Sequence, residues 1–268
     1  MITIGIDPVI GNIGSLAISW HGVLMALGIL TGILFSWWMA KRTDIPRGFI
    51  FEAAIWCVVL AILGARLVHV LDRWSDYSSN PVQIFAFWEG GLAWYGGLLG
   101  GILAGVIWAK LKGISWGLLA DVVAPGVILG LAVGRIGCTI NGDICGTPTS
   151  SPWSIIYTHP ASYPVGWGLG NTPLHPVTLY EIILNLIIFG VLLWLWGRLK
   201  PEGSLFAIMM MIYSFGRFFI SWLRPEQVEA SILGPLHQAH IISLVLFFGA
   251  IAFLVYRKVG WAKGHSPK

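Results

Sequence analysis

The chain has few charged residues and few cysteines. Only 10% of its 268 residues are Asp, Glu, Lys or Arg, whereas soluble domains carry about 25%, so an ordinary soluble domain is excluded. Three cysteines do not suggest a disulfide framework, although Cys138 and Cys145 are close enough in sequence for a bridge in an oxidising compartment. Neither an H-E-x-x-H motif nor a paired-cysteine spacing for a metal is found.

Long apolar runs fill most of the chain instead. Hydrophobic residues make up 56% of the sequence, and a membrane-spanning helix needs about 20 mostly apolar residues. We therefore predict an all-α, polytopic membrane protein, in which residues 1–268 form a single domain and 141–176 an extracytoplasmic loop. Its seven transmembrane helices are expected at Ser15–Ala40, Phe49–Leu71, Gly91–Leu111, Trp116–Ile140, Val177–Trp196, Gly203–Leu223 and His237–Tyr256.

The basic residues predict the orientation of these helices. The connections after the first, third and fifth helices, together with the C-terminal tail, hold eleven Lys and Arg residues, whereas the opposite side holds only Arg73 and Arg224. Because basic loops stay in the cytoplasm, we expect the N-terminus outside and the C-terminus inside. The net charge of +4 then reflects topology and anionic lipid, and no signal for nucleic acid is present.

With this topology, polar side chains gather in the outer half of the predicted bundle. Ionisable residues at membrane depth are costly and usually face a protein interior or cavity. We therefore expect a cavity open to the outer leaflet. Its candidate residues are His21, Arg66, Tyr95, Arg135, Asn141, Asp143, His175, Tyr180, Glu181, Tyr213, Arg217 and Arg224.

The run around Arg135 predicts an anion site. Gly134, Gly137 and Gly142 bring backbone close to Arg135 and to the polar Asn141. Guanidinium groups and glycine-rich backbone both bind phosphate or carboxylate, so a phospholipid head group is the expected ligand. The aromatic loop that follows, with Trp153, Tyr157, Tyr163 and Trp167, fits either a second amphiphilic substrate or an interfacial belt.

Six motifs, in order, resemble those of the bacterial prolipoprotein diacylglyceryl transferases. They lie at Gly64–Arg66, Gly90–Leu98, Asp121–Gly130, Gly134–Gly146, Leu174–Glu181 and Tyr213–Arg224. The resemblance implies an enzyme of the bacterial cell membrane whose site faces the extracytoplasmic leaflet. It would transfer the diacylglyceryl group of phosphatidylglycerol to the lipobox cysteine of a prolipoprotein signal peptide. A thioether forms, glycerol phosphate leaves, and no cofactor or metal is expected.

The sequence departs from this family at three informative positions. Tyr95 stands where the family commonly has His, and His21 where it commonly has Tyr. Cys138 stands where the family has Asn. His21 and Tyr95 are both candidate catalytic residues, and the choice of general base stays open between them, with His21 favoured because His titrates nearest neutrality.

The resemblance also distributes roles among the candidate residues. Arg135 and Arg217 are expected to bind the phosphate, with Arg217 also catalytic, since guanidinium forks match two phosphate oxygens. Asn141 and the three glycines would orient the head group. Seven residues are expected to support the site: Arg66, Asp143, His175, Tyr180, Glu181, Tyr213 and Arg224. Of these, Glu181 is expected to pair with Arg66 or Arg217.

Two alternatives remain open at this stage. The first is a lipid or anion transporter, which would need polar groups that continue to the inner side, where we place only Glu52 and Asp121. The second is a phospholipid-binding relative without catalytic activity. The oligomeric state is not predicted.

Overall fold

The computed structural model describes residues 1–14, 16–78, 80–86, 91, 93–226, 228, 231–233 and 236–261. The chain forms two compact units. Unit 1 comprises Met1–Ser36 and Ala120–Lys268, and unit 2 comprises Trp37–Leu119. That both units belong to one membrane domain stays a prediction.

Seven long helices follow the predicted apolar stretches in order: α1 (Trp20–Ala40), α2 (Arg47–Asp72), α4 (Trp94–Leu111), α5 (Trp116–Asn141), α7 (Val177–Leu195), α8 (Ser204–Ser221) and α9 (Gln238–Tyr256). Among the described residues, six helices are long and apolar enough to cross a membrane. The stretch within α4, Gly96–Leu111, is apolar but shorter. The chain is therefore a mostly helical, multi-pass membrane protein.

Short strands make the fold less purely helical than predicted. Two pairs lie near the N-terminus: β1 (Ile2–Ile4) runs parallel to β4 (Ile155–Tyr157), and β2 (Val9–Ile13) antiparallel to β3 (Leu16–Ser19). Because β3 pairs with β2, the first helix begins at Trp20 rather than at the predicted Ser15. The other pairs are β5 (Leu199–Lys200) with β8 (Gly260–Trp261), and β6 (Ser231–Leu233) with β7 (Leu236–His237).

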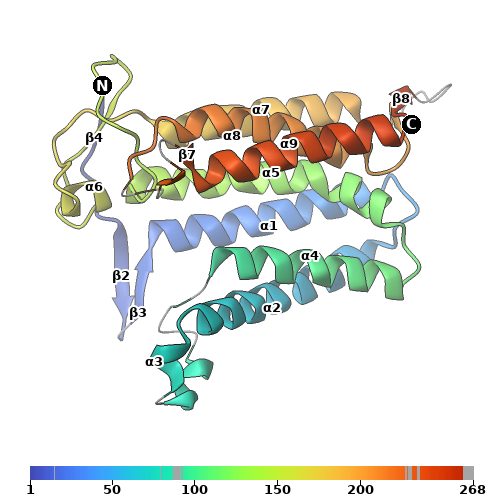
Figure 1. The fold of residues 1–268 in the computed structure, drawn as a ribbon, viewed down its shortest axis with the longest axis horizontal. Coiled ribbons are helices and arrows are strands. Elements are labelled where there is room, and N and C mark those ends of the chain that lie inside the picture. Colours follow the sequence, from blue (N-terminus) through green and yellow to red (C-terminus); the bar gives the residue numbers. More distant parts are fainter. Residues whose placement is uncertain are drawn as a thin grey trace. The chain divides into compact units, whose positions relative to one another are not determined.

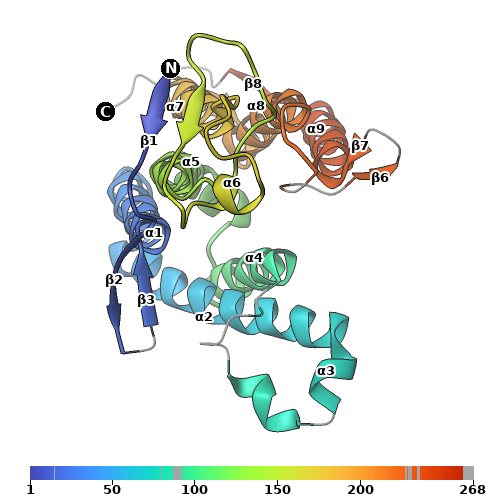
Figure 2. The same ribbon diagram turned by 90° about the vertical axis from the view of Figure 1, so that its left-hand side faces the viewer.

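In unit 1, α5, α7 and α8 share an apolar core and α9 packs beside α8 (Figures 1 and 2). Close backbone contact brings α1 against α5, because a Cβ atom added to Gly28 would lie 2.5 Å from the carbonyl oxygen of Gly130. This contact permits the N-terminal end of α1, including His21, to lie against α5. The core residues on α5, α7 and α8 are Ala124, Ile128, Ile188, Leu192, Leu195, Leu205 and Met209.

Asp121, which the sequence places toward the inner side, links α5 to the start of α8. Its carboxylate accepts hydrogen bonds from the backbone N–H groups of Gly203 and Phe206, at 2.8 and 2.9 Å. The first N–H groups of a helix have no partner within that helix, and its N-terminus favours negative charge. Asp121 therefore anchors this end of α8 without a cationic partner being needed.

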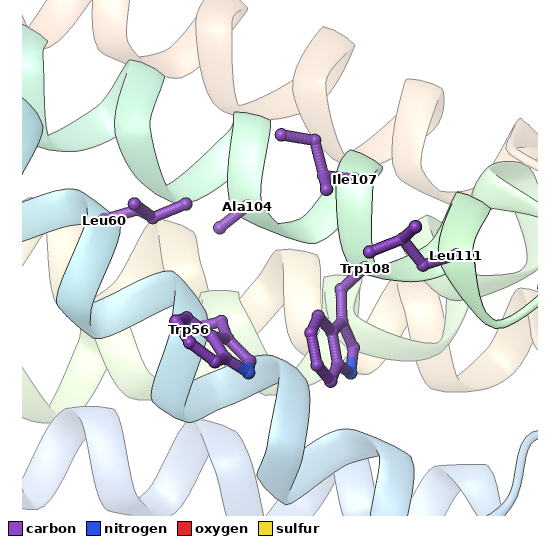
Figure 3. Close-up of a pocket in the computed structure, with 6 residues that line it drawn as sticks. All are labelled: Trp56, Leu60, Ala104, Ile107, Trp108 and Leu111. Atoms are coloured by element: carbon purple, nitrogen blue, oxygen red, sulfur yellow. The ribbon is translucent and has the colours of Figure 1, made fainter.

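In unit 2, α2 packs along α4 with little space between the backbones. A Cβ atom on Gly64 would lie 2.4 Å from the carbonyl oxygen of Gly96. The short elements α3 (Trp74–Ser78) and η1 (Pro81–Phe85) follow α2. An apolar pocket lies between α2 and α4 (Figure 3), lined by Trp56, Leu60, Ala104, Ile107, Trp108 and Leu111.

The predicted loop 141–176 is a folded part of unit 1, with β4 and a short helix α6 (Tyr163–Gly166). Tyr157 is only 2% exposed, and it packs with Ile4, Cys145, Ile155 and Leu174. Its hydroxyl donates to the carbonyl oxygen of Thr139 at 2.9 Å. Tyr157 is thus a core residue and not the interfacial aromatic that the sequence suggested, whereas Trp153 and Tyr163 are exposed.

Candidate functional site

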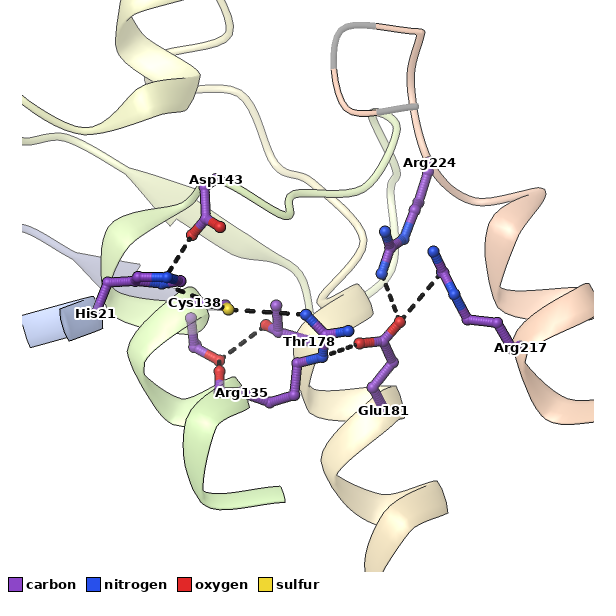
Figure 4. Close-up of polar contacts among 9 residues, drawn as sticks. His21, Arg135, Cys138, Asp143, Thr178, Glu181, Arg217 and Arg224 are labelled. Carbon is purple, nitrogen blue, oxygen red and sulfur yellow. Dashed lines mark hydrogen bonds and ion pairs between the residues drawn. The ribbon is translucent and has the colours of Figure 1, made fainter. Parts of the chain in front are cut away.

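Three arginines converge on one buried carboxylate, that of Glu181 (Figure 4). Glu181 is 1% exposed. Its Oε2 contacts Nε of Arg135, while its Oε1 accepts from Arg217 Nη1 at 3.2 Å and from Arg224 Nη2 at 2.5 Å. We call these four residues the arginine cluster.

Three helices and one turn position the arginine cluster. Arg135 lies six residues before the end of α5, Glu181 four residues after the start of α7, and Arg217 four residues before the end of α8. At 1.5 Å per residue these positions are about 6–9 Å from their helix ends. Arg224 follows in the turn after α8. The cluster therefore lies a little inside one end of the helical bundle of unit 1.

The charges within the arginine cluster do not balance. Three guanidinium groups carry three positive charges against the single negative charge of Glu181, which leaves a surplus of two. The side chains are largely buried, at 19%, 15% and 5% exposure for Arg135, Arg217 and Arg224. Largely buried guanidinium groups suit an anion with several oxygens, such as a phosphate.

A second group of side chains lies next to Arg135. His21 Nδ1 is 3.6 Å from Cys138 Sγ and 3.8 Å from Asp143 Oδ1. Arg135 Nη1 lies 3.8 Å from Cys138 Sγ, and Asn141 donates to Asp143 Oδ1 at 3.0 Å. Arg135 therefore joins this group, the His–Cys–Asp cluster, to the arginine cluster (Figure 4).

A threonine pair ties α5 to α7 between the two clusters. The Thr139 hydroxyl lies 2.9 Å from the carbonyl oxygen of Arg135 and 2.8 Å from the Thr178 hydroxyl. Thr178 is 1% exposed and stands three residues before Glu181. Sequence reasoning missed this pair, because a threonine within an apolar helix carries no signal of its partner.

The glycines near Arg135 are explained by packing. A Cβ atom on Gly134 would lie 2.8 Å from Met25 Sδ, and one on Gly137 would lie 3.0 Å from the Cα atom of His21, so both face α1. Gly142 has a φ of +78° and sits against Pro164. The expected contact of these glycines with a head group stays a prediction.

His175 and Tyr180 form a separate polar contact in unit 1. The Tyr180 hydroxyl lies 3.4 Å from His175 Nδ1 and accepts from Trp153 Nε1 at 2.9 Å. Tyr213, also expected to support the site, packs against the apolar core of α5, α7 and α8. That these three residues support the site stays a prediction.

Arg66 and Tyr95 belong to unit 2. Arg66 donates to the carbonyl oxygens of Ile84, Gly91 and Gln83, so it ties the segment after α3 to α2. Of the two partners considered for Glu181, the structure contains the pair with Arg217. Tyr95 lies in α4, but its side chain is outside the described residues.

All three cysteines are free thiols, so the considered Cys138–Cys145 bridge is not formed. Cys145 is buried next to Tyr157 and Leu174. Burial raises the pKa of its thiol to about 11, and the nearby Asp143 adds to this effect. Cys145 is therefore a neutral packing residue at physiological pH.

The sequence model of one protein family, described as prolipoprotein diacylglyceryl transferase, matches residues 8–256. The chain belongs to this family. Curated members named phosphatidylglycerol–prolipoprotein diacylglyceryl transferase include one from Nostoc sp., which is 38% identical and is matched over 94% of this chain and 90% of its own length.

Members of the family from distant bacteria match equally well. The relative from Dehalococcoides mccartyi is 36% identical over 96% of both chains. The one from Clostridioides difficile is 39% identical over 93% of this chain and 95% of its own length. Membership in this family makes the chain a transferase of lipoprotein biosynthesis.

Proposed function

We propose that this family member moves the diacylglyceryl group of phosphatidylglycerol to the lipobox cysteine of prolipoproteins at the arginine cluster. The observation that carries the proposal is the convergence of Arg135, Arg217 and Arg224 on the single carboxylate of Glu181. The guanidinium groups complement the phosphodiester of phosphatidylglycerol, and a position near the helix ends suits a ligand whose head group lies at the membrane surface.

The arginine cluster would act most strongly on the leaving group. When the glyceryl C–O bond breaks, its electron pair stays on oxygen and the departing glycerol phosphate gains negative charge. Fixed cations that face this charge in a poorly hydrated site stabilise the transition state more than the ground state. Arg135 and Arg217 are the assigned phosphate ligands, and Glu181 holds their guanidinium groups in place.

The acceptor thiol would enter beside His21. A thiol has an ordinary pKa of about 8.5, so its proton must be removed before the sulfur attacks. His21 Nδ1 lies 3.8 Å from Asp143 Oδ1, a pairing that would orient the imidazole toward the incoming thiol. Sulfur then forms a bond to the glyceryl carbon that carries the phosphate, and glycerol phosphate leaves.

The orientation of the chain follows from the same proposal. We place all seven helices across the bacterial cell membrane, with the N-terminus outside, the C-terminus in the cytoplasm and the arginine cluster at the outer leaflet. The eleven basic residues of the inner connections and tail support this orientation.

A mass measurement tests the activity. The full chain in vesicles that contain phosphatidylglycerol is incubated with a lipobox peptide, and the peptide mass is recorded. We expect a gain of one diacylglyceryl group on the cysteine, and no gain on a Cys→Ser peptide. No gain with folded, inserted protein would contradict the proposal and favour lipid binding or transport.

The roles of His21 and Tyr95 are tested by comparing His21→Phe with Tyr95→Phe in this assay. If His21 handles the thiol proton, His21→Phe slows transfer by about 10²–10⁴-fold and flattens its pH dependence between pH 5 and 8, whereas Tyr95→Phe leaves that pH dependence in place. Equal rates for both variants and the unmodified chain would remove both side chains from proton transfer.

A further inference from the structure

The His–Cys–Asp cluster brings together three kinds of metal ligand. The imidazole nitrogen of His21, the sulfur of Cys138 and a carboxylate oxygen of Asp143 all lie within 4.8 Å of one another. Imidazole, thiolate and carboxylate are the side chains that bind Zn²⁺ in proteins. Sequence spacing gave no hint of this, because His21 and Cys138 are 117 residues apart.

The distances between these ligand atoms fit a tetrahedral ion. With Zn–S of about 2.3 Å and Zn–N of about 2.0–2.1 Å, a tetrahedral angle separates S and N by about 3.6 Å. The observed separation of Cys138 Sγ and His21 Nδ1 is 3.6 Å. The corresponding N–O separation is about 3.4 Å, and the observed distance from His21 Nδ1 to Asp143 Oδ1 is 3.8 Å. The third separation, from Cys138 Sγ to the Asp143 carboxylate, lies within 4.8 Å, against about 3.6 Å around a tetrahedral ion. Asp143 would therefore move toward the other two ligands when the ion binds.

The surroundings of the cluster suit a bound cation as well. Asn141 donates to the carboxylate of Asp143, which is the kind of outer hydrogen bond that orients a metal ligand. Arg135 Nη1 lies 3.8 Å from Cys138 Sγ, so a positive charge stands beside the sulfur that a metal would bind. The side chains of His21 and Asp143 are 34% and 25% exposed, so an ion can reach the site.

We propose that His21, Cys138 and Asp143 bind a divalent cation of the Zn²⁺ class, whose fourth position takes the thiol of the acceptor cysteine. Three protein ligands with one open position are typical of catalytic zinc sites. The cation would lie beside Arg135 and therefore next to the proposed phosphate site. This role of the cation rests on the proposed diacylglyceryl transfer, whereas the binding of the cation does not.

The cation would promote the loss of the proton from the acceptor thiol. A thiol that coordinates a divalent metal loses its proton, which passes to water. The bound thiolate sulfur attacks the glyceryl carbon that carries the phosphate, so that an S–C bond forms and a C–O bond breaks. The electron pair of the C–O bond leaves with glycerol phosphate, and nothing is oxidised or reduced. In this arrangement His21 is a metal ligand, which replaces the direct proton transfer that His21→Phe tests under the proposed function.

Cobalt provides a direct probe of the site, because thiolate bound to Co²⁺ gives a charge-transfer absorption in the near ultraviolet. The full chain is purified in detergent, freed of metal with a chelator and titrated with Co²⁺. We expect one Co²⁺ per chain with this absorption. Cys138→Ser should abolish the absorption, and Asp143→Asn should weaken binding by roughly 10–100-fold.

Two controls keep the test decisive. Cys145→Ser removes a neighbouring buried thiol outside the cluster and should keep the absorption. Cys138→Asn, which introduces the residue that the family commonly has, guards against misfolding and should lose the absorption while its circular dichroism stays unchanged. An unmodified chain without the absorption, or a Cys138 variant that retains it, would overturn the metal site.

The transfer assay then separates binding from catalysis. Metal-free protein should transfer about 10²-fold more slowly than protein reloaded with Zn²⁺. Equal rates would overturn the role of the cation in activating the thiol. If neither form transfers the diacylglyceryl group, the proposed function fails, while the cobalt titration still decides whether the metal site exists.

Discussion

Asp121 and Glu181 are two carboxylates of unit 1 with different kinds of partner. Asp121 accepts from the backbone N–H groups of Gly203 and Phe206 at the start of α8. Glu181 instead meets the guanidinium groups of Arg135, Arg217 and Arg224 near the end of the same helix. Backbone dipoles compensate Asp121 without adding charge, whereas the arginine cluster keeps a surplus of two positive charges.

This difference separates a structural carboxylate from one that organises a binding site. Around Asp121, the backbone N–H groups at the start of α8 gain an acceptor, and the carboxylate gains hydrogen-bond donors. Around Glu181, one carboxylate orients three guanidinium groups. These groups are the ones that we propose to bind the phosphodiester of phosphatidylglycerol.

The largest effect is expected for Glu181→Gln. Removing the charge of one partner in a buried ionic group leaves the others uncompensated, which costs about 3–5 kcal/mol. We expect a marked fall in the thermal unfolding temperature of the detergent-purified protein, together with loss of transfer. If the unfolding temperature of Glu181→Gln fell no further than that of Asp121→Asn, the proposed difference between the two carboxylates would be contradicted.

Arg217→Gln should reduce the rate more than it reduces stability. Removing one group that stabilises developing charge typically costs about 10²–10³-fold in rate. Arg217→Lys should recover only part of the rate, because an ammonium group cannot contact two phosphate oxygens at once. Transfer rates at saturating phosphatidylglycerol measure the effect, and full activity of the lysine variant would argue against paired contacts.

Asp121→Asn should show the reverse pattern. The amide has one acceptor oxygen in place of two, so the N–H of Gly203 or of Phe206 loses its partner, and we expect a stability loss of about 1–2 kcal/mol. The transfer rate per folded molecule should remain close to that of the unmodified chain. A strong loss of rate without unfolding would show that this end of the bundle also takes part in the reaction.

The smallest effect at neutral pH is expected at Cys145, whose contribution to stability changes only in alkaline solution. Burial raises the pKa of its thiol from 9.0 to about 11 in the folded chain. Between these values the unfolded thiol ionises and the folded one does not, so stability falls as pH rises from 9 to 11. Cys145→Ser should lack this part of the pH dependence. Unfolding measured at pH 8 and pH 10.5 tests it, and identical slopes for both proteins would refute it.

Sequence reasoning was most successful where the signal was local. Among the described residues, apolar runs of about 20 residues located the six candidate spans and the shorter apolar helix Gly96–Leu111, because a spanning helix must be apolar along its length. It also anticipated that Glu181 pairs with Arg217, since lone charges within apolar helices need partners. It misplaced the first helix start, because the pairing of β3 with β2 depends on a hairpin that hydrophobicity does not reveal.

Long-range contacts explain the remaining differences. Gly134 and Gly137 look like a phosphate cradle in sequence, yet both face α1, which is more than a hundred residues away along the chain. The meeting of His21 with Cys138 and Asp143 likewise depends on how α1 packs against α5. Tyr157 belongs to a residue type that is common at membrane interfaces, but its side chain lies in the core of the folded loop.

Arg135→Ala, measured beside Asp121→Asn, tests the central claim most directly. Both variants are inserted into vesicles with phosphatidylglycerol, and the mass of a lipobox peptide is followed. We predict no detectable gain of a diacylglyceryl group with Arg135→Ala, although the protein is inserted and folded, and a normal gain with Asp121→Asn. Undiminished transfer by Arg135→Ala would contradict the assignment of the arginine cluster to the phosphate.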